Sequence, residues 1–301
     1  MSWKARNWVF LGDSLTEGVG STRVSHVTEL ARQLRTTSNG AVHEFRLRRI
    51  EANVFRQIDF NVAGFMNIDG ELVNAGGKQG SCGDLSLWNL ACEGQTIVSD
   101  FAWLPLITAL KPELVVVFRG ALESIIRPAA LREHTWPWWV PASWRGYAAM
   151  DPRCYFSDRW WRKAKQAGVD AFKQKARLKL LKQCKGQPLM DVDQLISHES
   201  SLLKSLRVRG ARVVIVGLLP VSDDRFPGSP EHFKNVNARL RDVAEREGAE
   251  FFDWAAQLAQ KGRHEDLFYR DSFHPNAAGA RALAEILQTH LCRDLAAIGH
   301  G

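Results

Sequence analysis

Short, continuous runs of apolar and β-branched residues alternate with longer helical patterns along most of this 301-residue chain. Strands that are covered on both faces read as continuous apolar runs, and strands separated by helices pair in parallel. The alternation therefore predicts an α/β fold, a three-layer sandwich with a central parallel sheet of about five strands. The expected strands are Asn7–Leu11, Leu85–Ala91, Leu114–Arg119, Arg212–Leu218 and Ala249–Asp253. The expected helices lie near Val24–Arg35, Asp191–Arg209, Glu231–Glu247 and Asn276–Cys292.

Two stretches are longer than a minimal plan of strands and helices requires. Residues 41–84 contain the alternating segments HEFRLRRIEANV and RQIDFNVAGFMNI, which predict an added hairpin. Residues 127–190 contain six of the eleven tryptophans, followed by a basic run. The chain has no internal repeat and no low-complexity linker, so we expect one domain over residues 1–301 with two insertions, at about 41–84 and about 127–190.

The net charge of +7 is concentrated in one segment of the chain. Residues 159–185 hold ten lysines or arginines and one acid, a local charge of +9, whereas the remainder holds thirty basic and thirty-two acidic residues. The run from Lys163 to Lys182 is compatible with a helix, on which apolar residues spaced three or four apart share one face. These apolar residues are Val169, Phe172, Ala176 and Leu180.

A basic helix of this kind is either a solvated face or a docking surface. The candidate partners are an anionic membrane surface, nucleic acid, or an acidic protein such as an acyl carrier. No helix-turn-helix, zinc-finger or RNP pattern accompanies the charge, so we favour an acidic or lipid-like partner and do not expect nucleic acid.

The cysteines and histidines point to a reducing compartment and to a protein without a metal. Five scattered cysteines with no C-x-x-C pair argue against both a disulfide framework and a structural zinc site. No run approaches the roughly 20 apolar residues that span a bilayer, and the first strand begins by about residue 7, which leaves no room for a signal peptide. We therefore expect a cytoplasmic protein with no metal and no cofactor.

The segment LGDSLTEGVG, residues 11–20, follows the first expected strand. In parallel sheets, ligands bind beyond the carboxyl ends of the strands, which is where Ser14 is placed. A serine hydroxyl needs a base to remove its proton and a third group to orient that base. The C-terminal segment DSFHPNAAGA offers both, because Asp271 and His274 are three residues apart. Pro275 disfavours helical geometry at His274 and suits the first turn of the helix that follows.

GDSLTEG at the first strand end and DSFHPNAAG near the C terminus resemble the motifs of the GDSL, or SGNH, hydrolase family. The resemblance implies a flavodoxin-like sandwich in which Ser14 is the nucleophile, His274 the general acid and base, and Asp271 the residue that orients His274. It covers the core of the chain, about half of it, and says nothing of the two insertions.

Two further family blocks match less evenly. In NLACEGQT, residues 89–96, Gly94 falls where the family glycine gives a backbone N–H to the oxyanion hole, beside the N–H of Ser14. In KPELVVVFRGALES, residues 111–124, Leu122 stands where the family has an asparagine that donates to the same hole. Losing one such donor typically costs about a hundred- to a thousandfold in rate. The candidate replacements are Gln95, Arg119 and Arg127.

Each of these features also has a purely structural interpretation. Ser14 could be a helix N-cap, and Gly94 a turn glycine. Asp13 and Glu17 are expected to stabilise the loop and the positive end of the helix. The tryptophan-rich stretch HTWPWWVPASW could form the core of the second insertion or line a lid or substrate channel above the serine. The candidate substrate-binding residues are Leu122, Trp136, Trp138 and Trp139.

Together these patterns predict a serine-dependent hydrolase of acyl esters or thioesters that acts through an acyl-Ser14 intermediate, with a small-molecule or lipid-like substrate. Two alternatives stay open. The enzyme could transfer the acyl group to an alcohol or amine, since Leu122 makes the oxyanion hole more apolar. The chain could also be a catalytically retired fold that binds an anionic partner through its basic, tryptophan-rich insertion.

Overall fold

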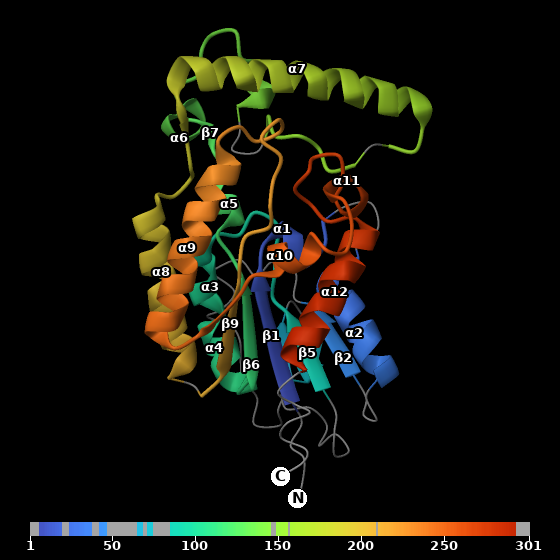
Figure 1. The fold of residues 1–301 in the computed structure, drawn as a ribbon, viewed down its shortest axis with the longest axis vertical. Coiled ribbons are helices and arrows are strands. Elements are labelled where there is room, and N and C mark those ends of the chain that lie inside the picture. The colour runs from blue at the N-terminus through green and yellow to red at the C-terminus, as the bar shows by residue number, and fades with distance from the viewer. Residues whose placement is uncertain are drawn as a thin grey trace, which may run out of the picture.

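A six-stranded parallel sheet forms the centre of the protein (Figure 1), whose computed structural model describes residues 6–19, 24–37, 42–46, 65–68, 71–74, 85–145, 149–155, 157–208 and 210–292. The strand order is β10-β9-β6-β1-β5-β2. The strands are β1 (Arg6–Gly12), β2 (Val42–Arg46), β5 (Leu85–Asn89), β6 (Leu114–Phe118), β9 (Arg212–Val216) and β10 (Glu250–Phe252). This arrangement confirms the expected three-layer α/β fold, with one strand more than the five that the sequence suggests.

The longer helices are α2 (His26–Thr37), α4 (Leu104–Leu110), α7 (Trp160–Cys184), α8 (Val192–Arg207), α9 (Ser229–Glu247) and α12 (Ala277–Leu291). The short ones are α1 (Ser14–Glu17), α3 (Ile97–Asp100), α5 (Ala121–Ser124), α6 (Ala130–Glu133), α10 (Trp254–Leu258) and α11 (His264–Leu267). Two 3₁₀ turns lie at Phe101–Trp103 and Ala142–Trp144. Of the described helices, none is both long enough and apolar enough to cross a membrane.

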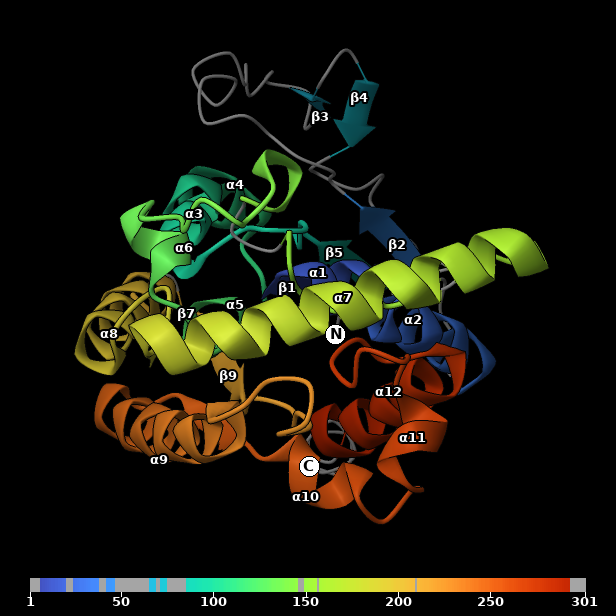
Figure 2. The same cartoon turned by 90° about the horizontal axis from the view of Figure 1, so that it is seen from above.

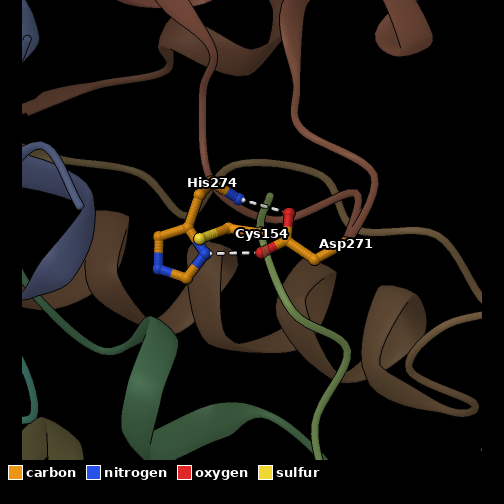
Figure 3. A group of neighbouring side chains, drawn as sticks. All are labelled: Cys154, Asp271 and His274. Carbon is orange, nitrogen blue, oxygen red and sulfur yellow. Dashed lines mark hydrogen bonds and ion pairs between the residues drawn. The ribbon is translucent and has the colours of Figure 1, made fainter. Parts of the chain in front are cut away.

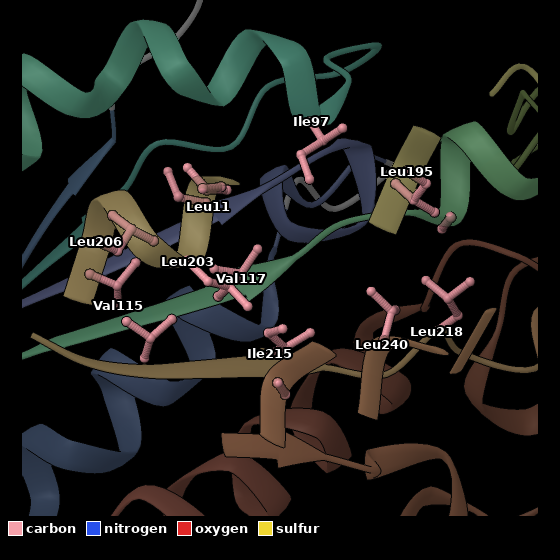
Figure 4. Packing of buried hydrophobic residues seen from close by; sticks show 14 of the residues in the cluster. Leu11, Ile97, Val115, Val117, Leu195, Leu203, Leu206, Ile215, Leu218 and Leu240 are labelled. Atoms are coloured by element: carbon pink, nitrogen blue, oxygen red, sulfur yellow. The ribbon is translucent and has the colours of Figure 1, made fainter. Parts of the chain in front are cut away.

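The continuous apolar strands are buried on both faces, as the two core clusters show. In β6, Val115 and Val117 pack with α3, α4, α8 and α9 on one side of the sheet (Figure 4). Their neighbours Leu114, Val116 and Phe118 pack with α2, α10 and α12 on the other side. Because successive side chains of a strand point to opposite faces, this partition follows directly from an unbroken apolar run.

The sixth strand, β2, corrects the prediction for residues 41–84. Val42–Arg46 pairs in parallel with β5 and forms the edge of the central sheet, although the sequence assigned it to an added hairpin. An edge strand alternates, with Val42 buried and His43 exposed, and that pattern also suits a hairpin. The described antiparallel pair is instead β3 (Phe65–Ile68) with β4 (Glu71–Asn74). Residues 47–64 lie outside the described part of the chain.

The second expected insertion contains α7, which crosses above the carboxyl ends of the strands (Figures 1 and 2). Where the chain leaves and returns to the sheet edge, β7 (Arg127–Pro128) pairs with β8 (Gly186–Gln187). Three half-buried tryptophans pack against Leu180 of α7 and against Val140 and Met150. They are Trp136, Trp139 and Trp144. This packing agrees with the interpretation of the tryptophans as the core of the segment.

The apolar face expected on the basic run is only partly correct. Leu180 is buried, but Phe172 is 70% exposed, with its ring edge-on to that of Trp144 at a centroid distance of 6.5 Å. The helix instead buries two charged residues, Asp170 and Arg177. The spacing of apolar residues predicts the wrong buried face for α7, because the contacts of this helix with the rest of the protein are largely polar.

Candidate active site

Ser14 lies at the first position of α1, directly beyond the carboxyl end of β1. The Asp13 carboxylate caps this short helix by accepting a hydrogen bond of 2.9 Å from the Leu15 N–H. The turn into α1 is tight, since a Cβ atom on Gly12 would lie 2.3 Å from the Thr16 hydroxyl. The structure thus fixes Ser14 in a rigid strand-to-helix turn and gives Asp13 the structural role expected of it.

Asp271 and His274 lie on the loop that leads into α12. The Oδ1 atom of Asp271 accepts hydrogen bonds of 3.1 Å from the backbone N–H groups of both Phe273 and His274. The loop is closed by an isolated bridge between Phe268 and Pro275. Beyond it, Asn276 caps α12 by accepting from the backbone N–H groups of the helix's first turn. The carboxylate of Asp271 is therefore held in place by backbone N–H groups of its own loop.

The structure brings Ser14, His274 and Asp271 together across 260 residues of sequence. The Ser14 hydroxyl lies 2.9 Å from Nε2 of His274, and Nδ1 of His274 lies 2.6 Å from Oδ2 of Asp271 (Figure 3). Asp271 is buried, whereas His274 and Ser14 are partly exposed. A buried carboxylate, an imidazole and an open hydroxyl in this order form the arrangement that activates a serine nucleophile.

Gly94 lies in the loop after β5 with a φ of +75°, a conformation that favours glycine. This loop is tied to the serine loop, because Glu17 accepts from the N–H of Glu93 and the side chain of Asn89 donates to the carbonyl of Thr16. Among the described residues, the N–H groups of Ser14 and Gly94 donate to no recorded acceptor. Both are thus available for an oxyanion.

Comparisons with known proteins identify the family of this chain. A model of the GDSL-like Lipase/Acylhydrolase family matches residues 73–282. The chain belongs to this family. The matched segment includes Gly94, Asp271 and His274 and begins after Ser14. A search of curated protein sequences returned no significant match.

Several solved structures share the GDSL fold at low sequence identity. A catalytic mutant of Axe2, an acetylxylan esterase from Geobacillus stearothermophilus, is 12% identical with a TM-score of 0.52, over 97% of this chain and 96% of that chain. The lipase/acylhydrolase from Enterococcus faecalis is 13% identical with a TM-score of 0.52, over 95% of both chains. TesA is 17% identical with a TM-score of 0.50, over 96% of this chain and 99% of that chain.

Two of the three candidates for the missing GDSL asparagine are occupied elsewhere. Arg119 is buried and pairs with Asp100, and its other N–H groups donate to the backbone carbonyl and side-chain oxygen of Gln95. Arg127 pairs with Asp151 and donates to the Leu122 carbonyl. The contacts from Arg119 orient the Gln95 side chain, whose amide N–H₂ has no recorded acceptor among the described residues.

Buried acids that sequence analysis did not single out lie around this arginine. Burial raises the pKa of Glu123 to about 7, while Arg119 opposes the rise. Burial, together with the negative charges of Asp100 and Glu123, raises the pKa of Glu199 to about 8. Both Glu199 oxygens lack a hydrogen-bond partner among the described residues. Sequence gives no sign of this cluster beyond Glu123 following Leu122, because Glu199 occupies an ordinary helical position.

A further feature missed by sequence analysis is Cys154, whose thiol lies beside Asp271 and His274 (Figure 3). One ligand atom each from Cys154, Asp271 and His274 can be chosen so that all three lie within 4.8 Å of one another. Burial and the charge of Asp271 raise the pKa of the Cys154 thiol to about 11. Although we expected no metal from the sequence, these three side chains could hold a divalent cation of the zinc type.

The predicted substrate-binding residues are scattered. Leu122 lies on α5, partly exposed, and its backbone carbonyl accepts from Arg127. Trp136 and Trp139 belong to the cluster around Val140, Met150 and Leu180, and the Trp139 ring lies 4.6 Å from the ammonium of Lys179. Trp138 is 91% exposed. The structure therefore does not gather the three tryptophans into one surface.

Proposed function

We propose that this GDSL-family protein is a serine hydrolase of acyl esters or thioesters that works through an acyl-Ser14 intermediate. The observation that carries the proposal is the continuous hydrogen-bond chain from Asp271 through His274 to Ser14. Support from the family is coarser, since its members are described as lipases and acylhydrolases and the similar structures include esterases.

In the proposed mechanism, Nε2 of His274 accepts the proton of the Ser14 hydroxyl as the oxygen attacks the substrate carbonyl carbon. Asp271 stabilises the imidazolium, and its other oxygen stays bound to two backbone N–H groups, so it does not move. His274 then gives the proton to the leaving alcohol or thiol, and the C–O or C–S bond breaks. Water, deprotonated by the same imidazole, releases the acid from Ser14.

The tetrahedral oxyanion of this mechanism is held by the N–H groups of Ser14 and Gly94. We propose the Gln95 amide as a third donor, because Arg119 fixes its oxygen and leaves its N–H₂ group free to turn toward the substrate. This donor would replace the family asparagine, whose position is occupied by Leu122.

Replacement of the nucleophile tests the proposal. Ser14→Ala is expected to lower kcat on a short-chain nitrophenyl ester by about 10⁴-fold or more and to abolish labelling by a fluorophosphonate probe. Ser201→Ala, which alters an exposed serine on α8, serves as the matched control. If Ser14→Ala keeps most of the turnover, or the wild-type protein is not labelled, Ser14 is not the nucleophile and the retired-fold alternative is favoured.

Acyl transfer is a second candidate, favoured by the apolar side chain at position 122. An alcohol or amine would then resolve the acyl-Ser14 intermediate in place of water. Turnover measured with and without an added alcohol separates the two reactions, because transfer yields a new ester while hydrolysis yields only the acid. We also propose that the side chain of Leu122, on α5, contacts the substrate.

We also propose that the basic segment 159–185 serves an anionic partner and that the protein works in a reducing compartment such as the cytoplasm. The charge of +9 on that segment supports the first part. The second part is supported by four described cysteines that form no disulfide with another described residue. These cysteines are Cys92, Cys154, Cys184 and Cys292.

A further inference from the structure

Helix α7 has an inner face that is bound to the active-site loops by polar contacts. Asp170, which is buried, pairs with Arg270 at 2.5 Å, and Arg270 directly precedes the catalytic Asp271. Arg177 donates to the Arg225 carbonyl at 2.6 Å, and its guanidinium lies 4.7 Å from the ring of Phe226. These contacts hold the helix at a fixed position above the carboxyl edge of the sheet (Figure 2).

The face of α7 turned away from Asp170 and Arg177 carries a row of exposed residues, which we call the outer stripe. Two of its members, Phe172 and Lys179, also contact Trp144 and Trp139 with their side chains. Its members are three or four positions apart and therefore share one side of the helix. They are Trp161, Lys165, Gly168, Phe172, Lys175, Lys179 and Lys182. Two aromatic side chains and four ammonium groups thus follow one another along a helix of 25 residues, about 37 Å in length.

The aromatic residues on and beside this stripe are unusually open to solvent. Phe172 is 70% exposed and Trp161 is 48% exposed, while the adjacent Trp160 is 79% exposed. Trp138, whose neighbour Trp139 lies against Lys179 of the stripe, is also exposed. The N-terminal end of α7, which begins at Trp160, projects beyond α2 and α12 in Figure 2.

The mixing of lysine with aromatic residues indicates which anionic partner fits. The core of a protein interface is depleted in lysine, which stays at the rim. At a lipid surface the two occur together, because tryptophan rings lie at the level of the headgroups while lysines meet the anionic phosphates. A long, straight and mixed stripe therefore matches a planar lipid surface better than a compact acidic protein.

We propose that the outer stripe of α7 docks the protein on an anionic lipid bilayer. The inner face, through the pair of Asp170 with Arg270, then keeps the loop that carries Asp271 and His274 on the side of α7 away from the headgroups. This inference deepens the proposed function by naming an anionic membrane as the partner of segment 159–185. Docking depends on no catalytic step. The protein could therefore hydrolyse a soluble ester without binding to vesicles, or bind to vesicles without hydrolysing an ester, and the two proposals can fail separately.

Vesicle co-sedimentation tests the proposal with the full chain carrying Ser14→Ala, which prevents turnover. We expect binding to phosphatidylcholine vesicles that contain about a third phosphatidylglycerol, with no comparable binding to phosphatidylcholine alone. Raising the salt from about 0.05 M to about 0.5 M should weaken binding strongly, because it screens the lysine charges. Each stripe lysine near the surface should change the partition coefficient by about fivefold.

Two sets of variants locate the surface. The triple change Lys165→Gln, Lys175→Gln and Lys182→Gln should reduce partitioning by about a hundredfold, and Trp161→Ala with Phe172→Ala should reduce it at least tenfold. The control triple Lys204→Gln, Lys234→Gln and Lys261→Gln removes the same charge from exposed positions elsewhere and should change it little.

Three outcomes overturn the proposal. Absence of binding to anionic vesicles at low salt does so, as does an equal loss in both lysine triples, which would show a mere effect of net charge. The third is binding of an acidic acyl carrier protein that requires the stripe lysines while anionic vesicles are ignored, because the partner of α7 would then be a protein.

Discussion

The substitution Glu199→Gln tests whether the buried acids behind the active site dominate the pH dependence of stability. Glu199 lies on α8, fully buried, with neither carboxyl oxygen paired among the described residues. Burial is the main cause of its raised pKa, and the negative charges of Asp100 and Glu123 add to it. Glutamine has nearly the same shape as the protonated acid but cannot ionise, so the variant isolates the effect of the proton.

The sign follows from the protons bound in each state. The unfolded chain loses the Glu199 proton near pH 4.5, whereas the folded protein keeps it up to about pH 8. Between these values the folded state binds more protons, so the free energy of unfolding falls as the pH rises. At 1.36 kcal/mol for each pKa unit, Glu199 alone should lower the stability by about 3 kcal/mol between pH 5 and pH 8.

Urea unfolding measured at several pH values between 5 and 8 checks this. Wild type should lose stability across the range, and Glu199→Gln should lose about 3 kcal/mol less. Glu245→Gln, the same change at an exposed position on α9, should follow the wild-type curve. If the difference between wild type and Glu199→Gln does not change with pH, the carboxyl is ionised or solvated in the folded protein, and the reasoning from its burial is wrong.

Two further predictions concern the active site. Gln95→Ala should lower kcat by about a hundredfold with little change in stability if its amide donates to the oxyanion, whereas unchanged turnover would leave the two backbone N–H groups as the only donors. Zn²⁺ should inhibit ester hydrolysis by binding Cys154, Asp271 and His274, more strongly as the pH rises, because binding must release the thiol proton. Chelation should restore activity, and Cys154→Ser should need at least about tenfold more Zn²⁺ for the same inhibition; equal inhibition of the variant would remove Cys154 from the site.

The central strands and the contact between Asp271 and His274 are predictable from sequence because their signals are local. An unbroken apolar run such as Leu114–Phe118 requires cover on both faces, and the three-residue spacing of Asp271 and His274 fits one turn of chain. Strand β2 is harder to assign, since an edge strand alternates as a hairpin does. The orientation of α7 is harder still, because buried Asp170 and Arg177 decide it and hydropathy counts both as surface residues.

Two other features could not be predicted, for a different reason. They are the position of Cys154 beside His274 and the cluster of buried acids around Arg119. Cys154 precedes α7 by a few residues, and its position beside His274 depends on how that helix is anchored to Arg270 and Arg225. Glu199 resembles any other polar residue of an amphipathic helix until its neighbours Asp100 and Glu123 are known. Both features arise from contacts between segments far apart in sequence, for which one sequence carries no signal.

The meeting of Ser14 with His274 is, by contrast, a consequence of topology. Ser14 follows β1, which lies between β6 and β5 in the middle of the sheet, so its loop opens at the centre of the carboxyl edge. The chain then continues into α2, and α2 packs beside α12 on one face of the sheet. Helix α12 begins three residues after His274, so the packing of these two helices brings the nucleophile loop and the histidine loop to the same edge. The apolar contacts between α2 and α12, remote from the reacting atoms, thus contribute directly to the distance between Ser14 and His274.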